Sequence, residues 1–383
     1  MQKTIKYIGY YDIQENANEK RIFSLAAKTK MDYIIHSLNQ NGLCIDIVSM
    51  AQSFEKKYYP AKKTSLNRGN NLILFPSFPT ANIITKFIKH ISPNINLFLY
   101  LVMNVKKNET IMVYHSLGYR NTMAIAKRIV GFKIVLEVEE IYQDIVHCSN
   151  ALRKKENESI TKADKYIFST GLLNERINIE CKPFIILYGT YYAEKKYDER
   201  FDDQKTHIVY AGSFDSRKGG VDSAISVSKY LDDKYHVHIA GFGSSNEKLR
   251  VLQMIDDVSM QTNCLISFEG ALHGEKYSKL LQKCHIGLST QNPIGEYNNS
   301  SFPSKVLSYM ANGLRVVSTR IKVLETSEIN DLIYYYDQNC PEDIAEVVKH
   351  INLEDVYDSR ARLKKLDTKF TNDIQTLLSE VSK

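Results

Sequence analysis

The chain has 383 residues, 43% of them hydrophobic and 25% charged, and carries a formal net charge of +6. This length exceeds one ordinary core and suits about two domains, while the composition is typical of a globular protein in water. The mild positive charge favours an anionic ligand or an anionic membrane surface. It is too low for a dedicated nucleic-acid-binding protein, so we expect no nucleic acid as a partner.

Cysteine usage and apolar runs indicate the compartment. The six cysteines are scattered and form no C-x-x-C pair, so we expect reduced core residues and a cytoplasmic protein. No signal-peptide pattern opens the chain. The longest apolar run, 95–105, is shorter than the roughly 20 residues that span a bilayer, so we expect it in a buried or interfacial helix.

The first half alternates between apolar runs and helical patterns such as 119–131. The runs are continuous and rich in Ile, Val, Leu and Tyr, as in parallel strands that are covered on both faces. The predicted strands are 5–11, 44–50, 70–77, 110–116, 132–140, 165–170 and 184–189. We predict an α/β domain over 1–195, followed by a charged linker at 196–206 that lacks apolar periodicity.

The alternation restarts after the linker. Strands are predicted at 207–213, 235–243, 265–270, 285–290, 315–319 and 332–337, with helices between them, among them 219–231, 245–257 and 274–283. This pattern predicts a second doubly wound α/β domain over 207–352, and the tail, 353–383, is predicted to form helices.

Two turns of the second domain follow strands, where doubly wound sheets bind ligands. In "YAGSFDSRKGG" (210–220), glycines permit close approach of a ligand and Lys218 offers a charge for phosphate. A solvated lysine in an ordinary turn fits that motif equally well. In "IAGFGSSNEKL" (239–249), Asn246 stands where a dinucleotide fingerprint needs its third glycine. This disfavours NAD and leaves either a nucleotide pocket or a turn without a ligand.

The third motif is "FPSKVLSYMANG" (302–313), a short helix after a polar loop. Pro303 suits the first helical position, behind a cap at Ser301 or Phe302, and Gly313 ends the helix. Helix starts attract anions, and a lysine in the first turn opposes the dipole unless an anion is bound there. A plain surface helix is the alternative. The candidate residues in the first turn are Ser304 and Lys305.

Together with "FEGALHGEKYSKLLQKCHIGLST", these motifs resemble, in order and spacing, the C-terminal domain of GT-B glycosyltransferases of family 4. They look most like bacterial polysaccharide and lipopolysaccharide enzymes with a P-S-K-x-x-x-Y-M-A-x-G segment. The resemblance covers 207–340 well and extends more weakly to 132–145 and 160–170. It implies an α/β fold of two Rossmann-like domains that face a cleft, with the last helix crossing back to the first domain.

The resemblance also implies an activity. The protein would transfer a sugar from a nucleotide-diphosphate donor to a glycan acceptor, with retention of configuration. No metal and no cofactor are expected. We expect a lipid-linked acceptor at the inner face of the cell membrane. Two alternatives stay open, a GT-B pseudoenzyme that acts as a binding partner and a GT-B sugar-nucleotide epimerase.

Carried over by motif, Lys218 would contact the donor diphosphate above Gly212 and Ser213. The turns Gly241–Gly243 and Gly270–His273 would border the base, and the loop 299–305 would hold phosphates and sugar. The family arginine after the first glycine is replaced by Ser213, for which Arg217 is the candidate substitute. The two family glutamates are replaced by Ser300 and Ser308, and Glu296 is the candidate carboxylate for the donor sugar, with a solvated loop residue as the alternative.

The first domain offers fewer signals. Glu137 and Glu139 share one face of the strand 132–140, and carboxylates at a strand end suit acceptor binding or proton handling. We take Glu139 as a catalytic candidate beside Lys218 and Glu296; an ordinary helix cap or a salt bridge is its alternative role.

Histidines and lysine pairs complete the candidates. His236 and His238 share a strand face, but the sequence shows no third ligand and therefore predicts no metal site. The pairs Lys56-Lys57, Lys62-Lys63 and Lys106-Lys107 suit contact with an anionic membrane or are simply solvated.

Overall fold

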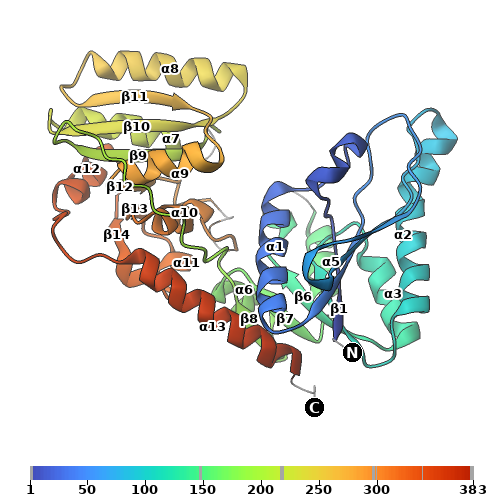
Figure 1. Cartoon of the computed structure of the whole chain (residues 1–383). Helices are drawn as coiled ribbons and strands as arrows, with labels where there is room; N and C mark the ends of the chain where they lie inside the picture. Colours follow the sequence, from blue (N-terminus) through green and yellow to red (C-terminus); the bar gives the residue numbers. More distant parts are fainter. Residues whose placement is uncertain are drawn as a thin grey trace. The chain divides into compact units, whose positions relative to one another are not determined.

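The computed structural model describes residues 3–145, 149–215, 220–295, 298, 300–338 and 340–379. The chain forms two compact units (Figure 1). Unit 1 comprises Met1–Thr190 and Lys369–Lys383, and unit 2 comprises Tyr191–Thr368.

Unit 1 is built on an eight-stranded sheet in the order β3-β4-β2-β1-β5-β6-β7-β8. All neighbouring strands are parallel except β3 and β4. The strands are β1 Thr4–Gly9, β2 Cys44–Ser49, β3 Lys62–Ser65, β4 Asn71–Leu74, β5 Thr110–Tyr114, β6 Lys133–Val138, β7 Lys165–Phe168 and β8 Phe184–Ile186. The helices are η1 Gln14–Glu19, α1 Leu25–Gln40, η2 Asn67–Gly69, α2 Ile83–Asn104, α3 Arg120–Val130, α4 Tyr142–Ile145, α5 Asn150–Ile160 and α6 Gly171–Ile177.

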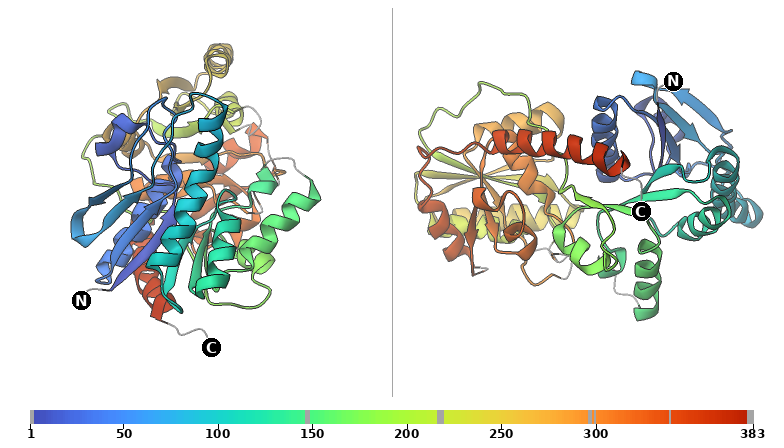
Figure 2. Two further views of the ribbon diagram at one scale, coloured as in Figure 1. Left: turned by 90° about the vertical axis from the view of Figure 1, so that its right-hand side faces the viewer. Right: turned by 90° about the horizontal axis from the view of Figure 1, so that it is seen from below.

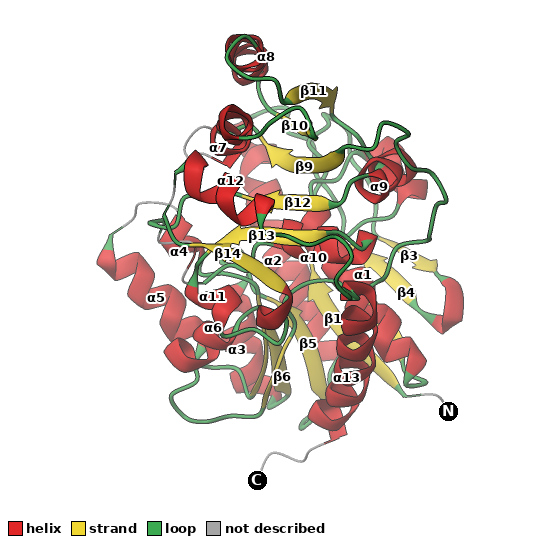
Figure 3. Cartoon of the chain, turned by 90° about the vertical axis from the view of Figure 1, so that its left-hand side faces the viewer, coloured by secondary structure: helices red, strands yellow, loops and turns green. Residues whose placement is uncertain are grey.

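Unit 2 is built on a six-stranded, fully parallel sheet in the order β11-β10-β9-β12-β13-β14, which Figure 3 shows as successive yellow strands. The strands are β9 Thr206–Ser213, β10 Tyr235–Phe242, β11 Leu265–Gly270, β12 Ile286–Ser289, β13 Arg315–Thr319 and β14 Ile333–Tyr336. The helices are α7 Gly220–Ser226, η4 Val227–Tyr230, α8 Ser245–Ser259, α9 Gly274–Lys283, α10 Ser304–Asn312, α11 Lys322–Glu325, η6 Asn330–Leu332 and α12 Pro341–Lys349. The last helix, α13 Ser359–Ser379, begins in unit 2 and belongs to unit 1 from Lys369 onward.

The strand order of unit 2 determines where a ligand can bind. Chain order runs outward from β9 in one direction and from β12 in the other, as in the doubly wound nucleotide-binding fold. In folds wound in this way, ligands bind at the carboxyl end of the two central strands, which are β9 and β12 in unit 2. We call this end of β9 and β12 the reversal point.

The strands follow from their sequences. Their central residues are buried Ile, Val, Leu and Tyr side chains, which pack against helices on the sheet faces in each unit. The alternation that predicted two doubly wound sheets is thus confirmed. The sequence missed β3, which is exposed, pairs only with β4 and contains Lys62 and Lys63, because a lysine-rich edge strand lacks the apolar pattern.

Among the described residues, none of the helices combines the length and the apolarity needed to cross a bilayer. The apolar run 95–105 lies mostly in α2, where Leu97 and Leu101 are buried while Ile95, Leu99 and Met103 are exposed.

Candidate functional site

The carboxyl edge of the unit 2 sheet brings two of the predicted turns into contact. Gly212 in β9 is in register with Gly241 in β10. A Cβ atom on Gly241 would lie 1.9 Å from the carbonyl oxygen of Gly212, so only glycine permits this approach. Ser213 follows on β9, half-buried, and Gly243 lies exposed just beyond β10. The close approach is between two strands, and the predicted role of these glycines beside a ligand stays a prediction.

Lys305 from α10 reaches the same place. Its Nζ lies 4.1 Å from the centroid of the Tyr210 ring, a cation–π contact. The same Nζ would lie 3.0 Å from a Cβ atom on Gly212. The missing side chain at Gly212 therefore leaves room for the ammonium group at the end of β9. The fold thus places one predicted cation directly at the reversal point of the sheet.

The start of α10 is held under this edge by Tyr309. Its hydroxyl accepts the N–H of Ala211 at 2.9 Å and donates to the carbonyl of Leu288 at 3.1 Å. Its ring occupies the space over Gly287, where a Cβ atom would lie 2.4 Å from the ring. Tyr309 thus connects α10 to both β9 and β12, the two strands at the reversal point.

The helix α10 begins one residue later than predicted. Pro303, expected at the first helical position, is the N-cap residue, with ψ of 98°, and Ser304 is the first helical residue. The cap makes no side-chain hydrogen bond, and the first turn contains no acidic residue. Gly313 ends the helix in the left-handed region, φ 85°, as expected. The predicted cap candidates Ser301 and Phe302 precede the helix, Phe302 buried and Ser301 half-buried.

Ser300 and Ser308, the two serines that the resemblance aligned with family glutamates, lie in unit 2. The Ser308 hydroxyl lies 3.1 Å from the Tyr277 hydroxyl of α9, so it is engaged inside unit 2. Ser300 is fully buried. Gly270, φ +71°, ends β11, and His273 is the exposed N-cap residue of α9. The turn predicted to border the base therefore exists as a strand-to-helix connection at the same edge.

Three of the strongest candidates cannot be placed. Arg217, Lys218 and Glu296 lie outside the described residues. The described chain resumes at Gly220, which begins α7. The carbonyl oxygen of Gly220 accepts a hydrogen bond of 2.6 Å from Thr290, which follows β12.

In unit 1, Glu139 follows directly after β6. Its carboxylate forms an ion pair with Lys30, whose Nζ also donates to the carbonyl of Leu187 at 2.7 Å. Glu137 is buried and accepts a hydrogen bond from the Tyr7 hydroxyl. Burial, followed by the charge of Glu139, raises the pKa of Glu137 well above its usual range. Glu139 thus makes the salt bridge that the sequence left open as its alternative role.

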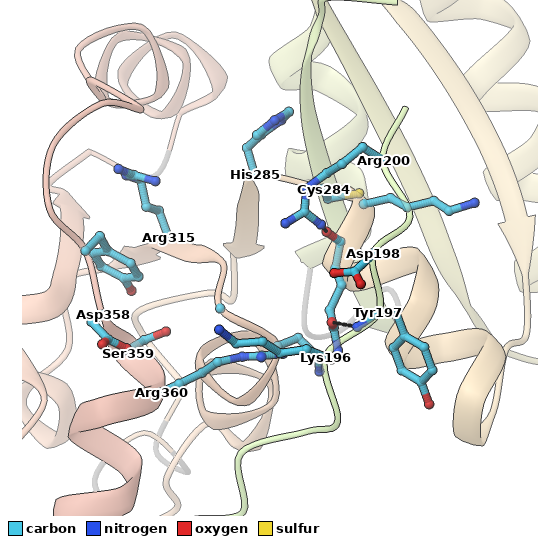
Figure 4. A pocket seen from close by; sticks show the side chains of 15 residues that line it. Lys196, Tyr197, Asp198, Arg200, Cys284, His285, Arg315, Asp358, Ser359 and Arg360 are labelled. Carbon is cyan, nitrogen blue, oxygen red and sulfur yellow. Dashed lines mark hydrogen bonds between the residues drawn. The ribbon is translucent and has the colours of Figure 1, made fainter. Parts of the chain in front are cut away.

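Unit 2 also contains a cavity of about 550 Å³ that the sequence did not predict (Figure 4). It lies at the amino ends of β12 and β13, opposite the edge that carries Gly212. Figure 4 shows Arg200, Arg315 and Arg360 around it. The charged residues of its lining are Lys196, Asp198, Arg200, Lys283, Arg315, Asp358 and Arg360. Its positive charge favours anions. These residues come from distant segments, so no local motif indicated them.

Comparison with known proteins finds a family match that lies within unit 2. Residues 205–352 match the family described as glycosyl transferases group 1. No curated protein sequence matches the chain.

Solved structures are similar over the whole chain. A glycosyltransferase from Rickettsia africae has a TM-score of 0.67 at 13% identity, with 99% of this chain and 100% of that chain covered. The lipopolysaccharide outer core galactosyltransferase WaaB, in its apo form, has a TM-score of 0.61 at 16% identity, with 97% and 99% covered. The Anabaena protein HepE, in complex with UDP and glucose, has a TM-score of 0.62 at 11% identity, with both chains covered completely.

The chain has the GT-B fold. At these identities the likeness establishes architecture, and the two doubly wound sheets confirm the fold class expected from the sequence.

Proposed function

We propose that the protein is a glycosyltransferase that transfers a sugar from a nucleoside-diphosphate donor to a glycan acceptor. One observation carries this proposal: Lys305, in the first turn of α10, places its ammonium beside Gly212 at the reversal point of a sheet within the matched segment 205–352. The similar Anabaena structure contains UDP and glucose, which are the two parts of such a donor.

The proposed chemistry is electrostatic. Cleavage of the bond between sugar and diphosphate places negative charge on the departing diphosphate. The Lys305 ammonium and the positive end of α10 are fixed before the reaction, so they stabilise that charge without reorganising. Lys218, on the loop after β9, is proposed as the second cation. By resemblance the transfer retains configuration, and this scheme needs no cofactor.

We further propose that the acceptor is lipid-linked and that unit 1 contacts the inner face of the membrane through α2. The left panel of Figure 2 shows α2 running along the near side of unit 1, beside α3. Its exposed apolar residues recur at helical spacing, and Lys86, Lys89 and His90 lie among them. They are Ile83, Ile84, Phe87, Ile88, Ile95, Leu99, Val102 and Met103. Apolar residues mixed with basic ones suit the interface of an anionic bilayer.

Vesicle sedimentation tests the membrane contact. We expect binding to phosphatidylcholine vesicles that contain phosphatidylglycerol, weaker binding at high salt, and loss of binding when Ile84 and Phe87 are both replaced by Ser. The matched control is Leu249→Ser, an equally exposed apolar residue on α8 of unit 2. Equal binding of the double variant and the control would contradict the role of α2.

A thermal-shift panel tests the donor site. UDP, GDP, dTDP, ADP and NAD are added to wild type and to Lys218→Ala. A ligand at 100 times its dissociation constant adds about 2.7 kcal/mol to the free energy of unfolding. We expect one diphosphate to stabilise the wild type and hardly the variant. No shift with any nucleotide favours the pseudoenzyme, and a shift with NAD alone contradicts the proposal. If the diphosphate sugar is interconverted without an acceptor, the activity is epimerisation.

A further inference from the structure

Three histidines of unit 2 lie together at the amino edge of the sheet, away from the proposed donor site. His207 of β9 is in register with His236 of β10, and His238 lies two residues further along the same face. One ring nitrogen from each lies within 4.8 Å of the others. His207 and His238 are buried, and His236 is half-buried. The sequence showed only the pair on β10, because the third histidine comes from a neighbouring strand.

Carboxylates fix the outer nitrogens of the two buried rings. His207 Nε2 lies 2.8 Å from Asp203 Oδ1, and His238 Nδ1 lies 2.7 Å from Glu269 Oε1. A carboxylate only accepts, so each outer nitrogen carries the proton and each inner nitrogen of the neutral ring carries a lone pair. Metal-binding histidines are oriented by carboxylates in this way.

The inner nitrogens face one another. His207 Nδ1 and His238 Nε2 are 2.9 Å apart. Two lone pairs at this distance repel unless a cation or a proton lies between them. With metal–nitrogen bonds of about 2.0–2.1 Å, this separation corresponds to an angle of about 90° at a shared ion. His236 Nδ1 is also buried and, among the described residues, has no hydrogen-bond partner, while its Nε2 contacts Ser267 at 2.6 Å.

We propose that His207, His236 and His238 bind one divalent transition-metal ion of the Zn²⁺ class through their inner nitrogens. Three imidazoles are a ligand set that Zn²⁺ accepts.

The ion has a structural role. The Phe201 ring, in the segment that leads into β9, stacks on His207 at 4.0 Å and on His238 at 4.9 Å between ring centroids. Asp203 of the same segment holds His207. Metal binding therefore fastens this segment, through Asp203 and His207, to β9 and β10. The inference is independent of the proposed transfer activity.

The test uses the full chain without a histidine tag, stripped with chelator and then given one equivalent of Zn²⁺. We expect one ion per chain after gel filtration, measured by elemental analysis, and a higher melting temperature. Co²⁺ in place of Zn²⁺ should give the visible absorption of a low-coordinate site with nitrogen ligands. Asp203→Asn should weaken binding about 10- to 100-fold, because it loosens the ring orientation.

Matched variants locate the ion. His238→Gln should abolish binding, whereas His350→Gln, which changes an exposed histidine of the same unit, should leave it intact. If His238→Gln fails to fold, His236→Gln, at the half-buried position, gives the same comparison. The proposal is overturned if wild type retains no Zn²⁺ and shows no Co²⁺ spectrum. A proton shared by His207 and His238 would then explain their close contact. Equal loss of metal in His350→Gln and His238→Gln also overturns it.

Discussion

Lys305 lies in the first turn of α10, where the helix dipole ordinarily disfavours a cation. The fold shows where its ammonium group lies. The side chain crosses to the Tyr210 ring and ends in the space that Gly212 leaves open. The Tyr210 ring and Gly212, from the motif 210–220, thus place the charge of Lys305, which comes from the motif 302–313. The arrangement keeps a full positive charge at the end of β9 while the rest of the lysine chain is partly covered.

We predict that Lys305→Ala weakens binding of the stabilising nucleoside diphosphate by roughly 10- to 100-fold, because a charge-assisted hydrogen bond contributes about 1.5–3 kcal/mol. Isothermal titration calorimetry measures the change. Lys322→Ala, an exposed lysine of α11, is the matched control and should bind as wild type. An unchanged dissociation constant in Lys305→Ala would remove this lysine from the donor site.

Glu137 gives a prediction for pH dependence. Its raised pKa means that the folded protein keeps this proton after the unfolded chain has lost it, at pH above about 4.3. Folding stability from this group therefore falls as pH rises, by at most about 1.4 kcal/mol per pH unit. Glu137→Gln removes this loss while an amide oxygen can still accept from Tyr7. The melting temperature of Glu137→Gln, relative to that of wild type, should therefore rise as the pH is raised from 4.5 to 7. A difference in melting temperature that does not change with pH would show that Glu137 does not titrate as inferred.

At the scale of elements, α10 is positioned by a tyrosine in its second turn rather than by its cap. The Tyr309 hydroxyl bridges Ala211 of β9 and Leu288 of β12, so it fixes α10 against the two central strands of the sheet. This contact explains why a short helix, whose cap makes no side-chain hydrogen bond, can hold a precise place.

We predict that Tyr309→Phe lowers the free energy of unfolding by about 2–4 kcal/mol. It leaves a buried N–H and a buried carbonyl without this partner, at a cost of about 1–3 kcal/mol each. Urea denaturation of unit 2 measures the loss. Tyr277→Phe removes the hydrogen bond with Ser308, a single contact among the described residues, and should cost less than Tyr309→Phe. The opposite ranking would show that α10 is held elsewhere.

At the scale of the molecule, the last helix belongs to both compact units. Residues from Lys369 onward pack in unit 1, where Phe370 lies 5.5 Å from the Tyr33 ring between centroids. There the buried Lys165 donates to the carbonyl of Leu377 at 2.5 Å. The covalent chain therefore joins the units twice, through the segment near Tyr191 and through α13.

Deleting 369–383 should destabilise unit 1 by roughly 5 kcal/mol, since burial of Phe370, Ile374 and Leu377 contributes about 1.5–3 kcal/mol per side chain. Hydrogen exchange should show faster exchange in α1 and β7, with unit 2 unchanged. A shorter deletion of 380–383 is the control and should leave exchange as in wild type. Equal protection of α1 in both deletions would mean that this half of α13 contributes little.

Much of this protein is determined by local sequence. Continuous apolar runs define parallel strands, glycines mark the close approach at Gly212 and Gly241, and Gly313 ends α10 because only glycine readily adopts its backbone angles. These features depend on neighbouring residues or on the backbone alone, so a single sequence reveals them. The edge strand β3 escaped prediction because its pairing, and not its composition, makes it a strand.

Strand order was decided only by the tertiary structure. It brings Lys305 to Gly212, Tyr309 to two strands, and His207 to His236. Residues on neighbouring strands of a parallel sheet are separated in sequence by whole crossover helices, so no spacing rule connects them. The sequence by itself therefore determined the elements and the residue types at their ends, while the register between strands determined which of those residues meet.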